Sequence, residues 1–248
     1  GDNWYYVDYY GAAMTGRREV DGVDYFFDSD GVMQANRWIE QDGGSFYVQS
    51  SGAVATNTWL HLGDKWFYVD AKGIRAVGLV KVGTGWYHFS DDGVMSTGWQ
   101  QIDGSWYYLG DSGAMATGWQ QIGGNWYYLG NSGAMATDWQ QIGGNWYYLG
   151  DSGAMATGWK LIHWHWYYFQ SNGAMAQNQW VDNYYLDRNG AMMINRTVTI
   201  NGRSYTFDGN GRWSTPATDG SCPSWAPVKG NVNRQGEKIF HQPGDQSY

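Results

Sequence analysis

Several residue types that stabilise or specialise other proteins are scarce in this sequence of 248 residues. Cys222 is the single cysteine, so by itself the chain supports neither a disulfide framework nor a cysteine metal site. All four prolines lie at Pro216 or later, which leaves residues 1–215 free to form uninterrupted β-hairpins. No apolar run approaches the length of a membrane span and no signal peptide is present, so we expect no membrane insertion.

Basic residues are absent from a long central stretch, because no Lys or Arg lies in residues 82–159. The formal net charge is −8. Nucleic acids and anionic membranes bind clustered Lys and Arg, so we exclude both as partners. A cation would meet only aromatic faces and these carboxylates: Asp91, Asp92, Asp103, Asp111, Asp138 and Asp151. For most of these Asp residues, a role in turns explains the residue type better than ligand contact.

Candidate catalytic residues are equally scarce. The only glutamates occupy divergent or terminal contexts: Glu19, Glu40 and Glu237. His163 and His165 would share a face if they lay on one strand, but two ligands are too few for a metal site. We therefore expect no catalytic residue, no metal and no cofactor in this chain.

What the sequence has in abundance is glycine, with 37 residues, and aromatic residues, at 18%. A marker glycine recurs every 20 or 21 residues, with one spacing of 17, at these positions: Gly11, Gly31, Gly52, Gly73, Gly93, Gly113, Gly133, Gly153, Gly173, Gly190 and Gly211. A methionine follows most of them after two or three residues. The sequence therefore predicts an array of about ten units. It opens partway through a unit, so we expect a piece of a longer protein.

Each unit is typical of a β-hairpin and a connector, as residues 98–113 show. A tight turn at Asp103-Gly104 predicts this register: Ile102 with Ser105, Gln101 with Trp106, Gln100 with Tyr107 and Trp99 with Tyr108. Trp99, Trp106 and Tyr108 then share one face, and Ile102 and Tyr107 share the other, where packing is expected. A lone hairpin is marginal in water, so the units must stack as a solenoid.

The units differ in quality. Four have two tryptophans seven residues apart: Trp99/Trp106, Trp119/Trp126, Trp139/Trp146 and Trp159/Trp166. The pair Trp59/Trp66 keeps the spacing without the preceding glycine. Elsewhere the pattern decays, with Leu79 at the first-tryptophan position, Arg17-Arg18-Glu19 in the first unit and a short hairpin after Trp180. We expect the divergent units to be structural repeats or caps.

Aromatic side chains form a core in part, but Val, Ile and Leu would do so without exposing so much π surface. A partly open cage of aromatic faces is a receptor for a cation, above all a quaternary ammonium. Each contact contributes about 0.5–2 kcal/mol, so a single site binds weakly. Repetition then gives avidity for a polymer.

The stretch "WQQIGGNWYYLGDSGAMATGW" at residues 139–159 resembles the choline-binding, or cell-wall-binding, repeat of Gram-positive bacterial and phage surface proteins. The resemblance covers roughly residues 1–212 and is strongest at 98–176. It implies an all-β, left-handed solenoid of stacked hairpins. It also implies a secreted or cell-surface, non-catalytic module that binds choline-bearing teichoic acid or another cell-wall polymer.

In that family, choline lies between consecutive hairpins, against two tryptophans of one unit, a tyrosine of the next and a nearby methionine. Carried over, the resemblance implies three sites: Trp99, Trp106, Tyr128 and Met115; Trp119, Trp126, Tyr148 and Met135; Trp139, Trp146, Tyr168 and Met155. A fourth, less regular one would use Trp159, Trp166, Tyr185 and Met175. We choose the second tyrosine of each pair because the register puts it on the tryptophan face. The first, such as Tyr127, stays open as the alternative.

Two other functions remain open. Related repeats in glucan-binding domains and clostridial toxin tails bind carbohydrate, and aromatic platforms also stack on sugar rings. The chain could equally be the anchoring part of a larger cell-wall hydrolase. The spacing of seven between tryptophans and the phased methionine favour choline. A homodimer formed through terminal hairpins is also left open.

Residues 213–248 differ from the repeats and contain all the prolines. They resemble a short extracytoplasmic domain at the ends of bacterial secreted nucleases and surface proteins. That family has a second cysteine just beyond the point where this chain ends, so the resemblance implies that Cys222 is half of a disulfide. A free thiol in a linker is the alternative. We therefore expect two parts, a repeat solenoid at 1–212 and a small irregular segment at 213–248.

Overall fold

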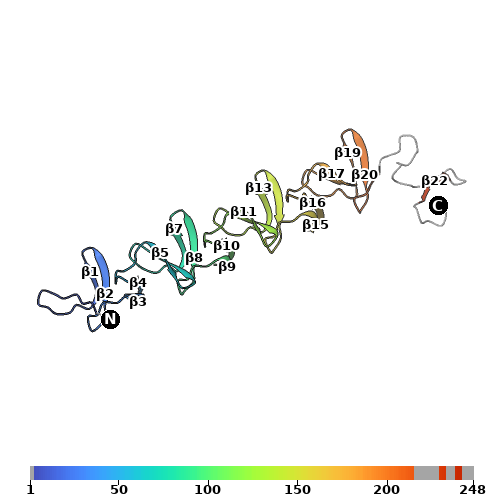
Figure 1. Cartoon of the computed structure of the whole chain (residues 1–248). Helices are drawn as coiled ribbons and strands as arrows, with labels where there is room; N and C mark the ends of the chain where they lie inside the picture. The colour runs from blue at the N-terminus through green and yellow to red at the C-terminus, as the bar shows by residue number, and fades with distance from the viewer. Residues whose placement is uncertain (1–2, 215–228, 233–237, 242–248) are drawn as a thin grey trace. The chain divides into compact units, whose positions relative to one another are not determined.

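The computed structural model describes residues 3–214, 229–232 and 238–241, and its regular elements there are antiparallel β-strands (Figure 1). Two compact units divide the chain, Gly1–Ala136 and Thr137–Tyr248, and each is considered by itself. Within the described residues, no helix has the length and apolarity needed to cross a membrane. Pro216 and Cys222 lie outside the described residues, and so do the predicted disulfide of Cys222 and most of the predicted segment 213–248.

The first unit contains six consecutive two-stranded hairpins. They are β1 (Gly16–Val20) with β2 (Val23–Phe27), β3 (Arg37–Gln41) with β4 (Gly44–Val48), β5 (Thr58–Leu62) with β6 (Lys65–Val69), β7 (Gly78–Val82) with β8 (Gly85–Phe89), β9 (Gly98–Ile102) with β10 (Ser105–Leu109), and β11 (Gly118–Ile122) with β12 (Asn125–Leu129).

The second unit continues the pattern and then varies it. Its strands are β13 (Asp138–Ile142) with β14 (Asn145–Leu149), β15 (Gly158–Ile162) with β16 (His165–Phe169), the short β17 (Gln179–Val181) with β18 (Tyr184–Leu186), β19 (Arg196–Ile200) with β20 (Arg203–Phe207) and β21 (Trp213–Ser214), and β22 (Lys229–Val232) with β23 (Lys238–His241).

The hairpin register predicted from the turn residues is confirmed. In β9–β10, Trp99 pairs with Tyr108 and Gln101 with Trp106. Asp103 and Gly104 have φ values of 49° and 81°, and two positive φ values are what a type I′ turn requires. The same register recurs in β11–β12, β13–β14 and β15–β16, so equivalent residues of different hairpins can be compared directly.

One turn departs from the expected residues. His163 (φ 46°) and Trp164 (φ 68°) form the turn between β15 and β16, where most other hairpins have at least one glycine. His163 therefore does not lie on a strand with His165, and the shared face considered from the sequence does not exist. Among the residues that the structure describes, no group of three or more His, Cys, Asp or Glu could hold a metal ion.

The most deeply buried residues are ones that the sequence did not single out. The last residue of the second strand is fully buried in nine of the described hairpins: Val48, Val69, Phe89, Leu109, Leu129, Leu149, Phe169, Leu186 and Phe207. Ile102 and Tyr107, which were expected to pack, are only half-buried. Other buried residues pack beside these strand ends, such as Phe67 in the cluster of Val69 and Ile162 in the cluster of Phe169.

Each connector binds to two hairpins. Met115 forms a β-bridge with Leu109 of the hairpin before it, and its backbone N–H donates to the carbonyl oxygen of Trp86, one hairpin earlier, at 2.8 Å. Met175 repeats this arrangement with Phe169 and Trp146. A methionine therefore lies beside the second tryptophan of the hairpin that precedes its own.

The marker glycines make room for these methionines. A Cβ atom on Gly173 would lie 2.2 Å from the sulfur of Met155, and Gly173 also has a φ of +81°. The connectors therefore approach too closely for any side chain, which explains why a glycine recurs at this phase.

Replacing Gly173 with alanine should destabilise the array through this contact. Gly158→Ala is the matched control, because Gly158 also has a positive φ, +68°, but nothing within 4 Å of an added Cβ. We expect Gly173→Ala to lower the free energy of unfolding by roughly 1–3 kcal/mol more than Gly158→Ala, the usual cost of overpacking. Denaturant titration followed by tryptophan fluorescence measures both, and equal losses would contradict the close packing of Met155 on Gly173.

Candidate aromatic cation site

The first tryptophan of a hairpin joins it to the next hairpin. The Trp139 ring lies 5.3 Å from Tyr148 within its own hairpin. It also lies 4.8 Å from Tyr167 and 5.6 Å from Phe169 in the following hairpin. These are ring-centroid distances at which aromatic pairs attract one another. Trp139 is therefore partly a packing residue and partly a wall.

The second tryptophan lies at the surface. Trp146 is 39% exposed, and its equivalents Trp66, Trp106, Trp126 and Trp166 are 41–43% exposed. Its ring stands roughly perpendicular to that of Trp139, at 80° and a centroid distance of 6.4 Å. An exposed indole held at a right angle to a half-buried one forms the corner of an open cage.

Residues of the following repeat complete this cage. Trp139, Trp146, Tyr167 and Met175 line a cavity of about 430 Å³, whose rim also includes Gln177, Arg188 and Asn189. The backbone N–H of Met175 donates to the carbonyl oxygen of Trp146 at 2.8 Å, which fixes the methionine at the cage. We call these four places the first-tryptophan, second-tryptophan, tyrosine and methionine positions.

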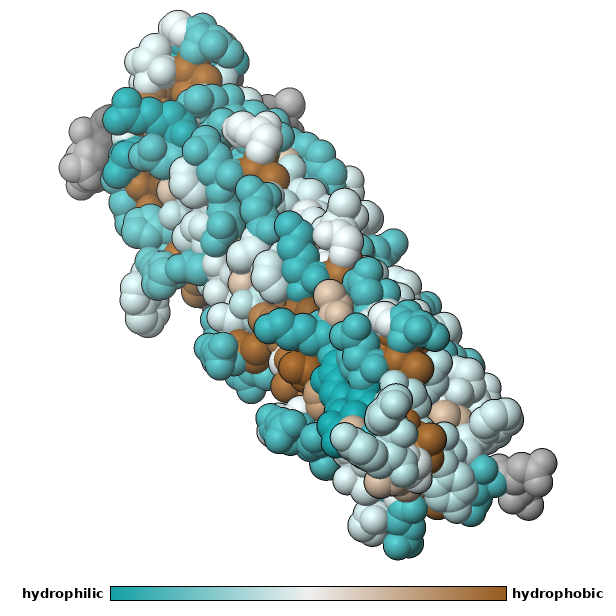
Figure 2. Space-filling model, turned by 90° about the vertical axis from the view of Figure 1, so that its left-hand side faces the viewer, coloured by the Kyte–Doolittle hydropathy of each residue, from teal (hydrophilic) through white to brown (hydrophobic). Residues whose placement is uncertain are grey.

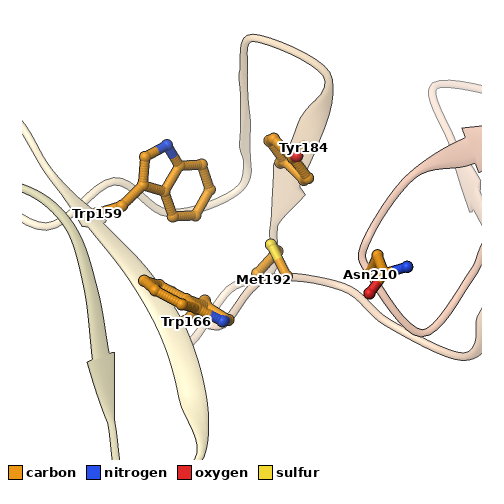
Figure 3. A pocket seen from close by; sticks show the side chains of 5 residues that line it. All are labelled: Trp159, Trp166, Tyr184, Met192 and Asn210. Carbon is orange, nitrogen blue, oxygen red and sulfur yellow. The ribbon is translucent and has the colours of Figure 1, made fainter.

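A second cavity of the same kind, of about 240 Å³, lies one hairpin later and is lined by Trp159, Trp166, Tyr184, Met192 and Asn210. In Figure 3, Trp159 and Trp166 lie on one side, Tyr184 lies across from them, and Met192 lies between Trp166 and Asn210. Its volume is below the range of about 300–1,000 Å³ that is usual for sites of drug-sized ligands. The cavity suits a small ion or group.

The structure changes which tyrosine and methionine belong to each pair of tryptophans. Tyr168 lies on the tryptophan face of its own hairpin, 5.3 Å from Trp159, and Met155 packs against Gly173. The cavity at Trp139 is lined instead by Tyr167 and Met175. Similarly, Tyr185 lies 5.1 Å from Trp180, and Tyr184 and Met192 line the cavity at Trp159.

The reason is that the two faces of a hairpin look in opposite directions. The face with both tryptophans and the second tyrosine looks toward the next hairpin. The opposite face, with the first tyrosine, looks toward the previous one. A tyrosine on the tryptophan face therefore cannot close the cage of the preceding repeat. The first tyrosine of each pair, the alternative named from the sequence, lines the two cavities instead.

The first unit contains the same arrangement. Trp99 lies 5.0 Å from Tyr127, and the N–H of Met135 donates to the carbonyl oxygen of Trp106 at 2.7 Å. The other two predicted members of this site lie elsewhere: Tyr128 is 5.2 Å from Trp119, and Met115 is bonded to Trp86.

The predicted site at Trp119 and Trp126 mixes the two units. Trp119, Trp126 and Met135 belong to the first unit and Tyr148 to the second, where it contacts Trp139.

The sequence analysis missed one complete set of walls. Trp59 lies 4.9 Å from Tyr87, and the N–H of Met95 donates to the carbonyl oxygen of Trp66 at 2.8 Å. The spacing of seven between Trp59 and Trp66 is sufficient to predict these walls, although no glycine precedes Trp59. One hairpin later Leu79 replaces the first tryptophan, so that cage lacks a wall.

The carboxylate of Asp187 contributes a negative potential at the Trp139 cage. Burial raises the pKa of the Tyr167 phenol, and the negative charge of Asp187 raises it further. Burial also raises the pKa of Tyr148, with additional contributions from Asp138 and Asp151. A negative potential that opposes phenol ionisation stabilises a positive ligand at the same place. Asp187 is held in its turn by the backbone N–H groups of Asn189 and Ala191.

Apolar surface is divided into small areas. On the face shown in Figure 2, strongly hydrophobic residues form separate patches among hydrophilic and intermediate ones. This face offers several small contact areas instead of one broad apolar interface.

Family models match most of the chain. The choline-binding repeat matches residues 14–59, 76–117, 96–138, 116–157, 136–180 and, in a second model, 174–213. A putative cell wall binding repeat matches residues 57–74. No curated protein matches the chain as a whole sequence.

Solved structures from Streptococcus pneumoniae are similar in fold. CbpJ is 31% identical with a TM-score of 0.61, and the match covers 85% of this chain and 97% of that one. Choline binding protein F, solved in the presence of a peptidoglycan analogue, is 27% identical with a TM-score of 0.62, and 96% of each chain is covered. The modular autolysin LytC is 27% identical with a TM-score of 0.63, over 91% of this chain but 51% of that one.

The chain belongs to the choline-binding repeat family, as its repeat pattern, its paired hairpins with aromatic cages and these matches show.

Proposed function

We propose that this chain is a non-catalytic, multivalent cell-wall-binding module that holds quaternary ammonium groups, such as the choline of teichoic acid, in cages between consecutive hairpins. The observation that carries the proposal is the cavity formed by Trp139, Trp146, Tyr167 and Met175. The same positions are filled at Trp159, Trp99 and Trp59.

The walls match the chemistry of the ligand. A quaternary ammonium has no N–H to donate, so π faces and a polarisable thioether are better partners for it than oxygen atoms. At about 0.5–2 kcal/mol for each cation–π contact, three rings contribute roughly 1.5–6 kcal/mol, which corresponds to dissociation constants from tens of millimolar to tens of micromolar. Several such cages on one chain bind a repeating polymer far more tightly than any single cage.

The proposal extends to architecture and location. We propose that residues 1–212 form a left-handed solenoid that carries the sites, that residues 213–248 are a separate small segment, and that the module acts at the outer surface of a cell. A larger cell-wall hydrolase, of which this chain would be the anchor, is compatible with the 51% coverage of LytC.

Calorimetry separates choline from the other candidate ligands. Titration with choline should release heat at several equivalents per chain, whereas its neutral isostere 3,3-dimethylbutan-1-ol should bind far more weakly because it lacks the charge. Heat with glucan oligomers and none with choline would instead establish carbohydrate recognition.

Removing one exposed tryptophan should remove one site. In Trp166→Ala the Trp159 cage loses its outer wall, and because Trp166 is 42% exposed the hairpin should remain folded. We expect one choline equivalent fewer by calorimetry and an unchanged far-ultraviolet circular dichroism spectrum. Trp164→Ala is the matched control, since Trp164 lies in the same hairpin, is 90% exposed and does not line the cavity. An equal loss in both variants would rule out the assigned cage.

The charge of Arg188 should weaken the Trp139 cage. Arg188 lines this cavity, whereas no cation lines the Trp159 cavity. An exposed charge contributes about 0.2–1 kcal/mol, so Arg188→Gln should raise choline affinity at Trp139 by about 1.5- to 5-fold at low salt. Fluorine NMR of 5-fluorotryptophan at position 146 measures it. Arg196→Gln, which removes an exposed cation away from both cavities, should have no effect there, and an equal effect of both changes would exclude a local role for Arg188.

A further inference from the structure

The cage beside hairpin β3–β4 has an arginine where other cages have the methionine, and this Arg75 lies in the connector after β5–β6. The backbone N–H of Arg75 donates to the carbonyl oxygen of Ser45 at 2.9 Å, as that of Met175 does to Trp146. Its side chain packs against Gly93, where an added Cβ would lie 2.5 Å from the Arg75 Cδ atom. Arg75 therefore occupies the methionine position.

The other three positions of this cage are also identifiable. Trp38 pairs with Tyr47 and so holds the first-tryptophan position, and its ring lies 5.4 Å from Phe67, at the tyrosine position of the next hairpin. Ser45 holds the second-tryptophan position and is buried. Because a serine stands here, this cage has no indole ring as its outer wall.

The arginine head lies in this cage. The guanidinium carbon of Arg75 is 5.4 Å from the centroid of the Trp38 ring, a cation–π distance. The Arg75 Nε atom is buried and has no hydrogen-bond partner among the described residues. The ion pair found in the described part of the chain involves a different arginine. The Trp38 ring is thus a cation–π partner of this half-buried guanidinium.

The hairpin before it reaches the same result with different residues. Arg17 holds the first-tryptophan position of β1–β2, and its guanidinium carbon is 4.8 Å from the centroid of Phe46, at the tyrosine position. Asp24 holds the second-tryptophan position and forms an ion pair with Arg17. Here too a guanidinium of the chain lies against the ring that would face a ligand.

We propose that Arg75 is an internal ligand that fills the Trp38–Phe67 cage and closes it to external cations, as Arg17 does one hairpin earlier. Cation binding in the first unit then begins at Trp59 and Trp66. A fixed guanidinium repels a second cation and also occupies its space. This inference rests on the proposed function, because it assumes that the cages with two tryptophans bind choline.

The first test converts the closed cage into an open one. The double variant Ser45→Trp with Arg75→Met supplies the missing indole and replaces the internal cation with the thioether. Calorimetry should then count one choline equivalent more than in the unmodified chain, and the single variant Arg75→Met should show no gain because the outer wall is still absent. A folded double variant without the extra equivalent overturns the inference.

The second test uses the unmodified chain and does not depend on how the double variant folds. The 5-fluorotryptophan resonances of Trp38 and Trp59 are assigned by Trp38→Phe and Trp59→Phe, and choline is then added. The Trp59 resonance should shift to saturation while that of Trp38 stays in place. A saturable shift of Trp38 as large as that of Trp59 overturns the inference, whereas no shift of any tryptophan contradicts the proposed function itself.

Discussion

The contact between the first tryptophan of one hairpin and the first tyrosine of the next is the interaction on which both fold and site depend. At Trp139 and Tyr167 it joins two hairpins that could not be stable alone, with ring centroids 4.8 Å apart. The same contact sets the inner corner of a cage, with Trp146 as its exposed wall. A cage therefore arises where consecutive hairpins pack and the first of them has both tryptophans.

The connector supplies the rest of the geometry. The backbone of Met175 is hydrogen-bonded to Trp146, and its side chain therefore starts beside the cage that Trp146 lines. That constraint also explains the divergent repeats. The side chain of any residue at this position lies beside the cage, and Arg75 therefore places its guanidinium against Trp38. The residue type at this position is therefore one determinant of whether a repeat is open or closed.

Much of the fold could be predicted from the sequence, because tight turns fix register locally. The turn at Asp103-Gly104 set every pair of β9–β10 correctly. The members of each cage could not be assigned by the same reasoning, since register within a hairpin does not say which face meets the previous hairpin. Tyr168 was chosen over Tyr167 for that reason. The burial of the last residue of each second strand, such as Leu149, was not predicted, because one leucine per repeat has no periodicity of its own within a strand.

Transfer of magnetisation from choline to the protein tests the central claim most directly. In an isotope-filtered NMR experiment, the methyl protons of bound choline should show nuclear Overhauser effects to the ring protons of Trp139, Trp146 and Tyr167 and to the methyl group of Met175. Effects to Tyr168 and Met155 in place of Tyr167 and Met175, or none to any tryptophan ring, would contradict the account.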